Sequence, residues 1–231
     1  MMKRLLILDL DNTFYNYENA HNTGLTKVFE YQNIFNTYEE FIQLYDEAKI
    51  KTHKAIPNSP SKHSKLIYFK NLFFNKVALD EIDKFENIYW TEFIKNASLQ
   101  NSGIEKLKNK KNSDNIYFLF TNQNLNTQLR KIKIWGIDIF NEIITSEEAG
   151  YEKPKKEFFD FVKPSVDKYF KNGYKVFALG DSYENDLDYW LKEYNADCYL
   201  IDNNLTETVV SEDITTSSLN KSVDIIFNSD K

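Results

Sequence analysis

Two aspartates close the first apolar run of the chain. In RLLILDLDNTFYN, residues 4–16, Asp9 and Asp11 follow a run that is typical of a buried strand. Their spacing of two keeps both side chains near one face while the segment stays extended. Carboxylates this close repel, and each resists ionisation unless a cation compensates the charge. The first strand therefore predicts a polar site at its carboxyl end.

Further polar residues follow the later apolar runs. Thr121 and Asn122 come directly after IYFLF, and Asp181 comes directly after KVFALG, with Asp186 five positions later. Lys153 lies in the loop between these two runs. In open parallel sheets, ligands bind beyond the carboxyl ends of the strands. We therefore expect these side chains to converge with the two aspartates of the first run on one edge of a sheet.

This set of side chains suits phosphoryl chemistry. Carboxylates without nearby His or Cys favour a hard cation, and Mg²⁺ is the ion we expect. Mg²⁺ and Lys153 would attract a dianionic phosphoryl group, to which Thr121 and Asn122 can donate hydrogen bonds. Asp9 would then be the nucleophile on phosphorus. Asp11 would protonate the leaving oxygen and later deprotonate the attacking water.

Taken singly, these residues also fit structural roles. Asp9 and Asp11 could form a turn and a helix cap, and Asp181 is a common type of helix N-cap. Lys153 before a proline is more often a solvated surface lysine. The chemical interpretation depends on the whole set occurring in this order.

The pattern along the chain predicts an α/β fold with an insertion. Short continuous apolar runs indicate strands buried on both faces, and helical patterns separate most of them, which favours a parallel, doubly wound sheet. Residues 15–97 instead show successive amphipathic helices with aromatic stripes, typical of an inserted helical subdomain. The predicted strands are 5–10, 116–120, 142–145, 175–180 and 198–201, with a further candidate at 223–227.

Four motifs resemble those of a known superfamily. DLDNT, the FTN of residues 120–122, EKPKKEFF and GDSYENDL, in this order and spacing, resemble the signature motifs of the haloacid dehalogenase (HAD) superfamily. Residues 15–97 resemble the helical cap that its cap-type-one members carry between the first and second motifs. The resemblance implies a Rossmann-like core of residues 1–14 and 98–231 with a cap of residues 15–97.

The resemblance also implies a role for each matching residue. Asp9 would form an aspartyl-phosphate, with Asp11 as general acid and base. Thr121 would bind the phosphoryl group with Asn122 beside it, and Lys153 would stabilise charge on the nucleophile and on the phosphoryl oxygens. The metal ligands would be the Asp9 carboxylate, the Asp11 backbone carbonyl and Asp181, with Asp186 acting directly or through water.

Asp11 indicates which reaction to expect within the superfamily. Dehalogenases attack carbon and do not need an acid two residues after the nucleophile, whereas phosphatases and phosphomutases do. We therefore predict a Mg²⁺-dependent phosphatase acting on a small phosphomonoester: a sugar phosphate, a phospho-acid or a nucleoside monophosphate. A phosphomutase and a non-catalytic module that binds phosphorylated ligands are the alternatives. Tyr15, Tyr17, His21 and Asn22 follow the first motif, where contact with substrate and simple packing are equally compatible with the sequence.

Bulk properties limit the partners and the location. The 231 residues carry a formal net charge of -6, with acidic and basic residues interspersed, which argues against nucleic acid and anionic membranes. A single cysteine, Cys198, fits a reducing compartment. No apolar stretch approaches the length of a bilayer span. We expect a cytoplasmic monomer or homodimer whose partner is a small phosphorylated metabolite.

Overall fold

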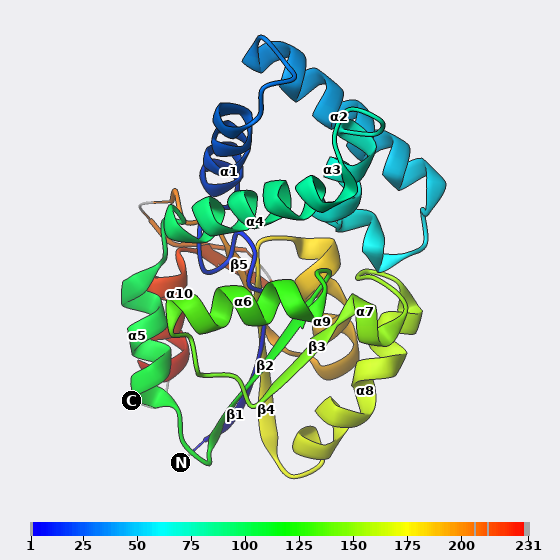
Figure 1. Ribbon diagram of the computed structural model, residues 1–231. Helices are drawn as coiled ribbons and strands as arrows, with labels where there is room; N and C mark the ends of the chain where they lie inside the picture. Colours follow the sequence, from blue (N-terminus) through cyan, green and yellow to red (C-terminus); the bar gives the residue numbers. More distant parts are fainter. Residues whose placement is uncertain (1, 206, 212, 229–231) are drawn as a thin grey trace. The chain divides into compact units, whose positions relative to one another are not determined.

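The computed structural model of this chain describes residues 2–205, 207–211 and 213–228. The chain forms two compact units, one made of Met1–Asn16 with Leu99–Lys231 and one made of Tyr17–Ser98. The first unit contains a β-sheet flanked by helices, and the second is wholly helical (Figure 1). The polypeptide therefore leaves the sheet after its first strand and returns to it before the second, as the sequence pattern predicts.

The α/β unit is organised around one sheet. Among the described residues its strand order is β3-β2-β1-β4-β5-β7-β6, and every pair is parallel except β6 with β7. The order reverses between β1 and β4, which makes the sheet doubly wound and confirms the predicted Rossmann-like α/β fold with a helical insertion. The strands are β1 (Lys3–Leu8), β2 (Asn115–Thr121), β3 (Glu142–Thr145), β4 (Tyr174–Gly180), β5 (Asp197–Ile201), β6 (Val209–Val210) and β7 (Ile214–Ser217).

Helices α8 (Lys156–Phe170) and α9 (Asp188–Tyr194) cover one face of the sheet. Leu5 and Ile7 point to this face, where they share a buried cluster with Val162 of α8 and Trp190 of α9. The intervening Leu6 is equally buried but points to the opposite face, because side chains alternate along a strand. Both faces of the central strands are therefore apolar, which explains the continuous apolar runs of the sequence.

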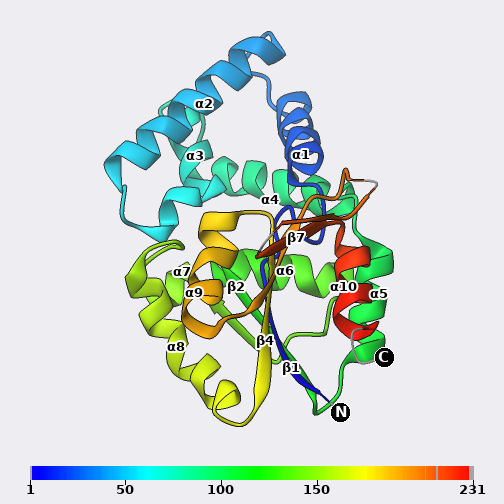
Figure 2. The same ribbon diagram turned by 180° about the vertical axis from the view of Figure 1, so that it is seen from behind.

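Helices α5 (Asn101–Lys110), α6 (Leu125–Trp135) and α10 (Leu219–Asn228) lie on the opposite face (Figures 1 and 2). The Tyr117 hydroxyl donates a hydrogen bond of 3.1 Å to the Leu107 carbonyl of α5. The buried Arg4 side chain donates one of 3.2 Å to the Ile226 carbonyl of α10. The short helix α7 (Ser146–Ala149) follows β3 directly, and Thr145 caps its N-terminus in a capping box.

The helical unit has an aromatic core of its own. Its elements are α1 (Tyr17–Tyr31), α2 (Tyr38–Ala55), the 3₁₀ helix η1 (Pro60–His63), α3 (Lys65–Leu72) and α4 (Leu79–Lys95). The rings of Phe73 and Phe85 stack with their centroids 4.1 Å apart. A Cβ at Gly24 would lie 2.8 Å from the Tyr89 ring, so this glycine allows α1 and α4 to pack closely. The aromatic stripes of the sequence are this core.

One predicted element is wrong. Residues 223–227 form part of α10 and not a strand. The buried residues of α10 are Leu219, Ser222, Val223 and Ile226, which repeat at helical spacing along one side. The outer strands β6 and β7 were not foreseen, because their residues are polar or exposed. Among the residues that the structure describes, none of the helices has the length and apolar character of a bilayer span.

Candidate active site

The aspartates and Thr121 of the site lie at or just beyond the carboxyl ends of the three central strands. Leu8 of β1 is in register with Leu119 of β2 and with Leu179 of β4, so these strands end at the same level. Asp9 continues β1 for one residue, because its backbone N–H donates a hydrogen bond of 3.0 Å to the Leu179 carbonyl. Its carboxylate therefore lies at the point between β1 and β4 where the strand order reverses, the usual ligand position in such sheets.

Lys153 is the buried cation of the site. Its ammonium group donates to the Asp9 carboxylate at 2.9 Å, to the Asp186 carboxylate at 2.6 Å and to the Phe120 carbonyl at 2.7 Å. An ammonium group has three N–H donors, so all three are engaged. The charges of Asp186 and Asp9 raise the pKa of Lys153 although burial acts to lower it. The lysine is thus held as a cation between two carboxylates that come from different strand ends.

Asn122 fixes the loop that carries this lysine. Its side-chain oxygen accepts a hydrogen bond of 2.8 Å from the Lys153 backbone N–H, and its amide nitrogen donates one of 3.0 Å to the Lys153 carbonyl. The side chain therefore pairs with the backbone of Lys153 in the manner of a neighbouring strand. In this structure Asn122 orients Lys153, and its donation to a phosphoryl group stays a prediction.

Asp186 is held close to β4 by the short π-helical segment η2 (Tyr183–Leu187). One carboxylate oxygen accepts a hydrogen bond of 3.0 Å from the Ser182 backbone N–H, and the other accepts from Lys153. A Cβ at Gly180 would lie 2.3 Å from the Asp186 Cβ and 2.4 Å from a carboxylate oxygen. The glycine of GDSYENDL is therefore required by the approach of Asp186 to the strand end.

Three carboxylates form a cluster that suits a cation. Asp9, Asp181 and Asp186 each offer an oxygen, and these oxygens lie within 4.8 Å of one another. Burial raises the pKa of Asp9 well above its usual value against the pull of Lys153, and the nearby acidic groups raise it further. Asp181 is exposed at the side of the cluster, but partial desolvation and the charge of Asp186 raise its pKa to about 6. Carboxylates alone at this spacing fit a hard divalent ion such as Mg²⁺, which would relieve the repulsion.

The Asp11 carboxylate points to a different set of partners. Its Oδ1 accepts hydrogen bonds from Lys131 at 2.5 Å and from the Tyr15 hydroxyl, and its Oδ2 accepts one of 3.0 Å from the Gln128 amide. Burial acts to raise the pKa of Asp11, but the charge of Lys131 and these hydrogen bonds outweigh it and lower the pKa. The two aspartates of DLD thus sit in opposite electrostatic environments. The side chain of Asp11 is not part of the three-carboxylate cluster.

Sequence reasoning missed two of these residues. Gln128 and Lys131 lie on α6 and are fully buried. The helical pattern of residues 125–136 is equally compatible with these two side chains lying on an exposed polar face. Their spacing of three on a helix that follows the second motif was the available signal, since it places both on one face. The sequence is compatible with either packing or substrate contact for Tyr15, and the structure shows it fully buried with its hydroxyl donating to the Asp11 carboxylate.

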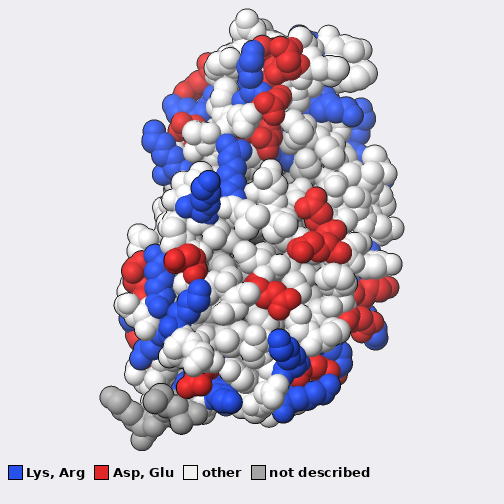
Figure 3. Space-filling model, turned by 60° about the horizontal axis from the view of Figure 1, so that its bottom comes forward, with Lys and Arg blue, Asp and Glu red and all other residues white. Residues whose placement is uncertain are grey.

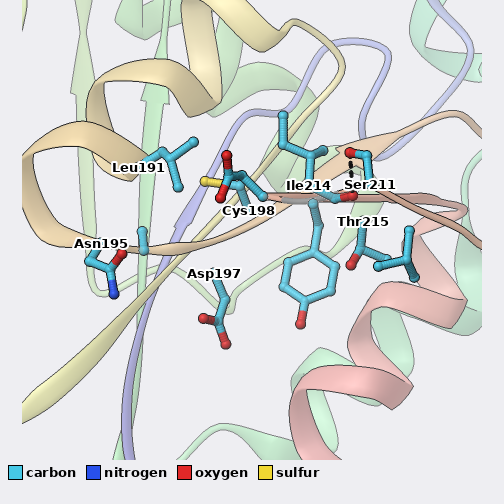
Figure 4. A pocket seen from close by; sticks show the side chains of 11 residues that line it. Leu191, Asn195, Asp197, Cys198, Ser211, Ile214 and Thr215 are labelled. Carbon is cyan, nitrogen blue, oxygen red and sulfur yellow. Dashed lines mark hydrogen bonds between the residues drawn. The ribbon is translucent and has the colours of Figure 1, made fainter.

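A separate hollow of about 310 Å³ lies beside β5 and β7 (Figure 4). It is lined by Asn195 and Asp197 near the amino end of β5 and by Ile214 and Thr215 of β7. The Asp197 carboxylate forms an ion pair of 2.6 Å with Lys175. The acidic cluster lies beyond the carboxyl ends of β1 and β4, whereas this hollow lies at the amino end of the parallel strand β5. The two sites are therefore distinct.

Comparison with known proteins agrees with this geometry. A family model described as haloacid dehalogenase-like hydrolase matches residues 3–188. A ribulose-1,5-bisphosphate 5-phosphatase of Halopiger xanaduensis is 24% identical over 193 residues, which cover 80% of each protein. The HAD-hydrolase YfnB of Bacillus subtilis is 24% identical over 187 residues, or 80% of this chain and 78% of YfnB.

Solved structures show the same fold. The structure of YfnB bound to magnesium superposes with a TM-score of 0.67 at 19% identity over 99% of this chain and 100% of that one. A 2-haloacid dehalogenase of Pseudomonas syringae gives a TM-score of 0.65 at 12% identity over 98% and 99% of the two chains. Proteins named as a phosphatase and as a dehalogenase are thus both similar to this chain, and the residues of the site must distinguish between the two reactions.

Proposed function

This chain belongs to the haloacid dehalogenase-like hydrolase family, and on that premise we propose that it is a Mg²⁺-dependent phosphatase of small phosphomonoesters. The observation that carries the proposal is the pair Asp9 and Asp11. A nucleophilic carboxylate alone suffices for attack on carbon, but loss of an alkoxide from phosphorus requires an acid beside it. Asp11 supplies that acid within two residues of the nucleophile. The similarity to a ribulose-1,5-bisphosphate 5-phosphatase supports the same choice.

In the first step a carboxylate oxygen of Asp9 attacks phosphorus. The new bond joins this oxygen to phosphorus, and the bond from phosphorus to the leaving oxygen breaks with its electron pair. Asp11 gives a proton to that oxygen, so the substrate leaves as a neutral alcohol. The dianionic substrate brings negative charge to Asp11, which favours its protonated form against the effect of Lys131.

In the second step water attacks the aspartyl-phosphate. Asp11, now ionised, takes a proton from the water as the new phosphorus–oxygen bond forms. The bond from phosphorus to Asp9 breaks, which releases inorganic phosphate and restores the Asp9 carboxylate. Lys153, held between Asp9 and Asp186, provides a fixed positive charge next to the negative charge that develops on the phosphoryl oxygens.

The site residues also fit the proposed cofactor. Asp9, Asp181 and Asp186, with the backbone carbonyl of Asp11, would hold Mg²⁺, and the ion would neutralise charge on the nucleophile and the phosphoryl group. Thr121 would contribute its hydroxyl to the phosphoryl oxygens. The binding of magnesium by the YfnB structure supports this assignment.

We further propose that residues 15–97 act as a cap that excludes bulk water and restricts the substrate to small metabolites. The core of residues 1–14 and 98–231 would carry the chemistry. Acidic and basic side chains are both scattered over the face shown in Figure 3, and the net charge of the chain is -6, which supports a small metabolite over nucleic acid as its partner.

A panel of phosphomonoesters tests the proposal. Purified protein is incubated with sugar mono- and bisphosphates, phosphorylated hydroxy acids and nucleoside monophosphates, with and without Mg²⁺, and released phosphate is measured. We expect Mg²⁺-dependent release from at least one class, and none from the Asp9→Asn variant. Isomerised substrate without phosphate release would identify a phosphomutase. Binding of phosphomonoesters without any turnover would indicate the non-catalytic module instead.

A further inference from the structure

A buried polar network on α6 connects Asp11 with Thr121. The Gln128 amide nitrogen donates to Asp11 Oδ2 at 3.0 Å and to the Thr121 hydroxyl at 2.8 Å. The Lys131 ammonium donates to Asp11 Oδ1 at 2.5 Å and to the Tyr15 hydroxyl at 3.1 Å. Tyr15, Gln128 and Lys131 are fully buried. Because a buried donor is costly unless it is hydrogen-bonded, the N–H and O–H groups of these three side chains have little freedom to turn away from Asp11. The Gln128 oxygen itself is buried without a hydrogen-bond partner.

The donor count fixes the orientation of Gln128. Its amide nitrogen has two hydrogens, and both are used, one on Asp11 and one on Thr121. A flipped amide would place its oxygen against the Asp11 carboxylate, where two acceptors would repel. The ionised carboxylate therefore selects the observed rotamer. One NH₂ group thus sets the distance between the proposed acid and a proposed phosphoryl-binding hydroxyl.

The same count shows which hydrogen and which lone pair stay available on the Thr121 hydroxyl and the Asp11 carboxylate. The Thr121 hydroxyl accepts hydrogen bonds from the Gln128 amide and from the Gln123 backbone N–H at 3.3 Å, which engages both of its lone pairs. Its own hydrogen is left to donate to a phosphoryl oxygen. At Asp11, Oδ1 accepts two hydrogen bonds and Oδ2 accepts one, so the remaining lone pair is on Oδ2.

We propose that Tyr15, Gln128 and Lys131 are positioning residues that hold Asp11 so that Oδ2 alone exchanges a proton with the leaving oxygen and with water. The assignment rests on the phosphatase function proposed above and adds three residues to it. Tyr15 and Lys131 anchor Oδ1. Gln128 aligns Oδ2 with the Thr121 hydroxyl, so it affects both proton transfer and phosphoryl binding.

The alternative is that these residues only attach α6 to the sheet. Two aryl phosphates distinguish the two roles, because they differ in their need for an acid. The p-nitrophenolate ion leaves without a proton, whereas the more basic phenolate of phenyl phosphate benefits from one. The parameter kcat/KM reports the phosphorylation step for both esters. A structural defect lowers it equally for both, and a misplaced acid lowers it selectively for phenyl phosphate.

The experiment measures kcat/KM for both esters with the wild type, Lys131→Met, Tyr15→Phe and Gln128→Leu. General acid catalysis is worth about 10²–10⁴-fold, and we expect Lys131→Met to lose about 10–100-fold of it on phenyl phosphate. Loss of the Lys131 charge makes Asp11 easier to protonate, and we expect the misplacement of Oδ2 to outweigh that gain. Its kcat/KM on p-nitrophenyl phosphate should stay within about threefold of wild type by the same reasoning. Tyr15→Phe should show the same selectivity with a smaller loss of kcat/KM. Because it changes no charge, it serves as the test if Lys131→Met does not fold. Gln128→Leu should weaken both reactions, and phenyl phosphate more.

Lys133→Met is the matched control, because Lys133 lies on the same helix with its side chain exposed. It should leave both reactions unchanged. Equal losses on the two esters in the folded Lys131→Met and Tyr15→Phe variants, or no loss on either, would overturn the proposal and leave the phosphatase function standing. A wild-type protein that hydrolyses neither these esters nor the phosphomonoester panel would refute the function itself, and the positioning role with it.

Discussion

Replacement of Lys153 by methionine removes the only group that bonds both Asp9 and Asp186 among the described residues. Methionine is one atom shorter than lysine and keeps an unbranched apolar stem, so the change is mainly the loss of one positive charge. The lysine side chain is 4% exposed, and those of Asp9 and Asp186 are 10% and 5% exposed. Two buried carboxylates would then face each other without a cation, and the Phe120 carbonyl would lose its donor.

The expected loss of stability is large. Breaking a buried ion pair by removing one partner costs about 3–5 kcal/mol, because the remaining charge is left uncompensated. For a chain of this length each kcal/mol shifts Tm by about 2–4 °C, which gives a decrease of roughly 6–20 °C in the absence of Mg²⁺. Mg²⁺ should restore part of this loss, because it binds the folded carboxylate cluster and not the unfolded chain.

The pH dependence of the variant follows from the direction of the carboxyl pKa. Burial raises the pKa of Asp9 above its unfolded value even with Lys153 present, and removal of the lysine raises it further. A carboxyl whose folded pKa is raised destabilises the fold where it is ionised, above that pKa. The penalty is relieved as pH falls through the folded pKa toward the unfolded value. The deficit of Lys153→Met should therefore be greatest at neutral pH and shrink on acidification.

Thermal unfolding of metal-free wild type, Lys153→Met and Lys153→Met/Asp186→Asn measures the effect at several pH values. The double variant should recover part of the loss, because it removes one of the two stranded charges. Lys156→Met is the control, since its ion pair with Asp160 is solvent-exposed and such pairs contribute little. If Lys153→Met melts within a few degrees of this control at neutral pH, the buried carboxylates are not held together by Lys153.

Three further outcomes are expected. Asp9→Asn should abolish turnover while leaving the Tm of the protein near or above that of the wild type, as measured by phosphate release and thermal unfolding; normal turnover would refute its role as nucleophile. Gly180→Ala should destabilise the protein by about 1–3 kcal/mol through overpacking against Asp186 and reduce activity strongly. If this contact is the cause, adding Gly180→Ala to Asp186→Gly should cost little further stability. Additive losses of stability in the double variant would exclude the contact as the cause. The increase of Tm on adding Mg²⁺ should weaken as pH falls through about 6, because the metal site requires Asp181 in its ionised form and its pKa is raised to about 6. Asp181→Asn should remove most of this increase. An unchanged increase in this variant would exclude Asp181 as a ligand.

The core strands could be predicted from the sequence because strands that are buried on both faces consist of continuous apolar residues. Continuous apolar runs predicted β1 to β5 within two residues at each end, and the polar residues after β1, β2 and β4 marked one edge of the sheet. The segment 223–227 was misassigned because an apolar run of five residues fits a strand or a helix equally well. The deciding residue, Leu219, lies outside the run.

The network around Asp11 could not be predicted in the same way. Gln128 and Lys131 are residue types that usually lie on exposed helix faces, and only the packing of α6 on the sheet buries them. Asn122 illustrates the same limit. Its position beside Thr121 was evident, but its pairing with the Lys153 backbone joins residues 31 positions apart and depends on the tertiary fold.

The central claim is that Asp9 becomes covalently phosphorylated during turnover. Protein mixed with a substrate found in the panel and Mg²⁺ is quenched in acid within the first turnover, digested and examined by mass spectrometry. We predict an acid-stable, base-labile phosphoryl group on the peptide that contains Asp9 and its absence in Asp9→Asn. The group should accumulate in Asp11→Asn when p-nitrophenyl phosphate is the donor, because its leaving group needs no proton whereas hydrolysis of the aspartyl-phosphate still needs the base. Turnover at the wild-type rate with no phosphoryl group on Asp9 at any quench time would contradict the account.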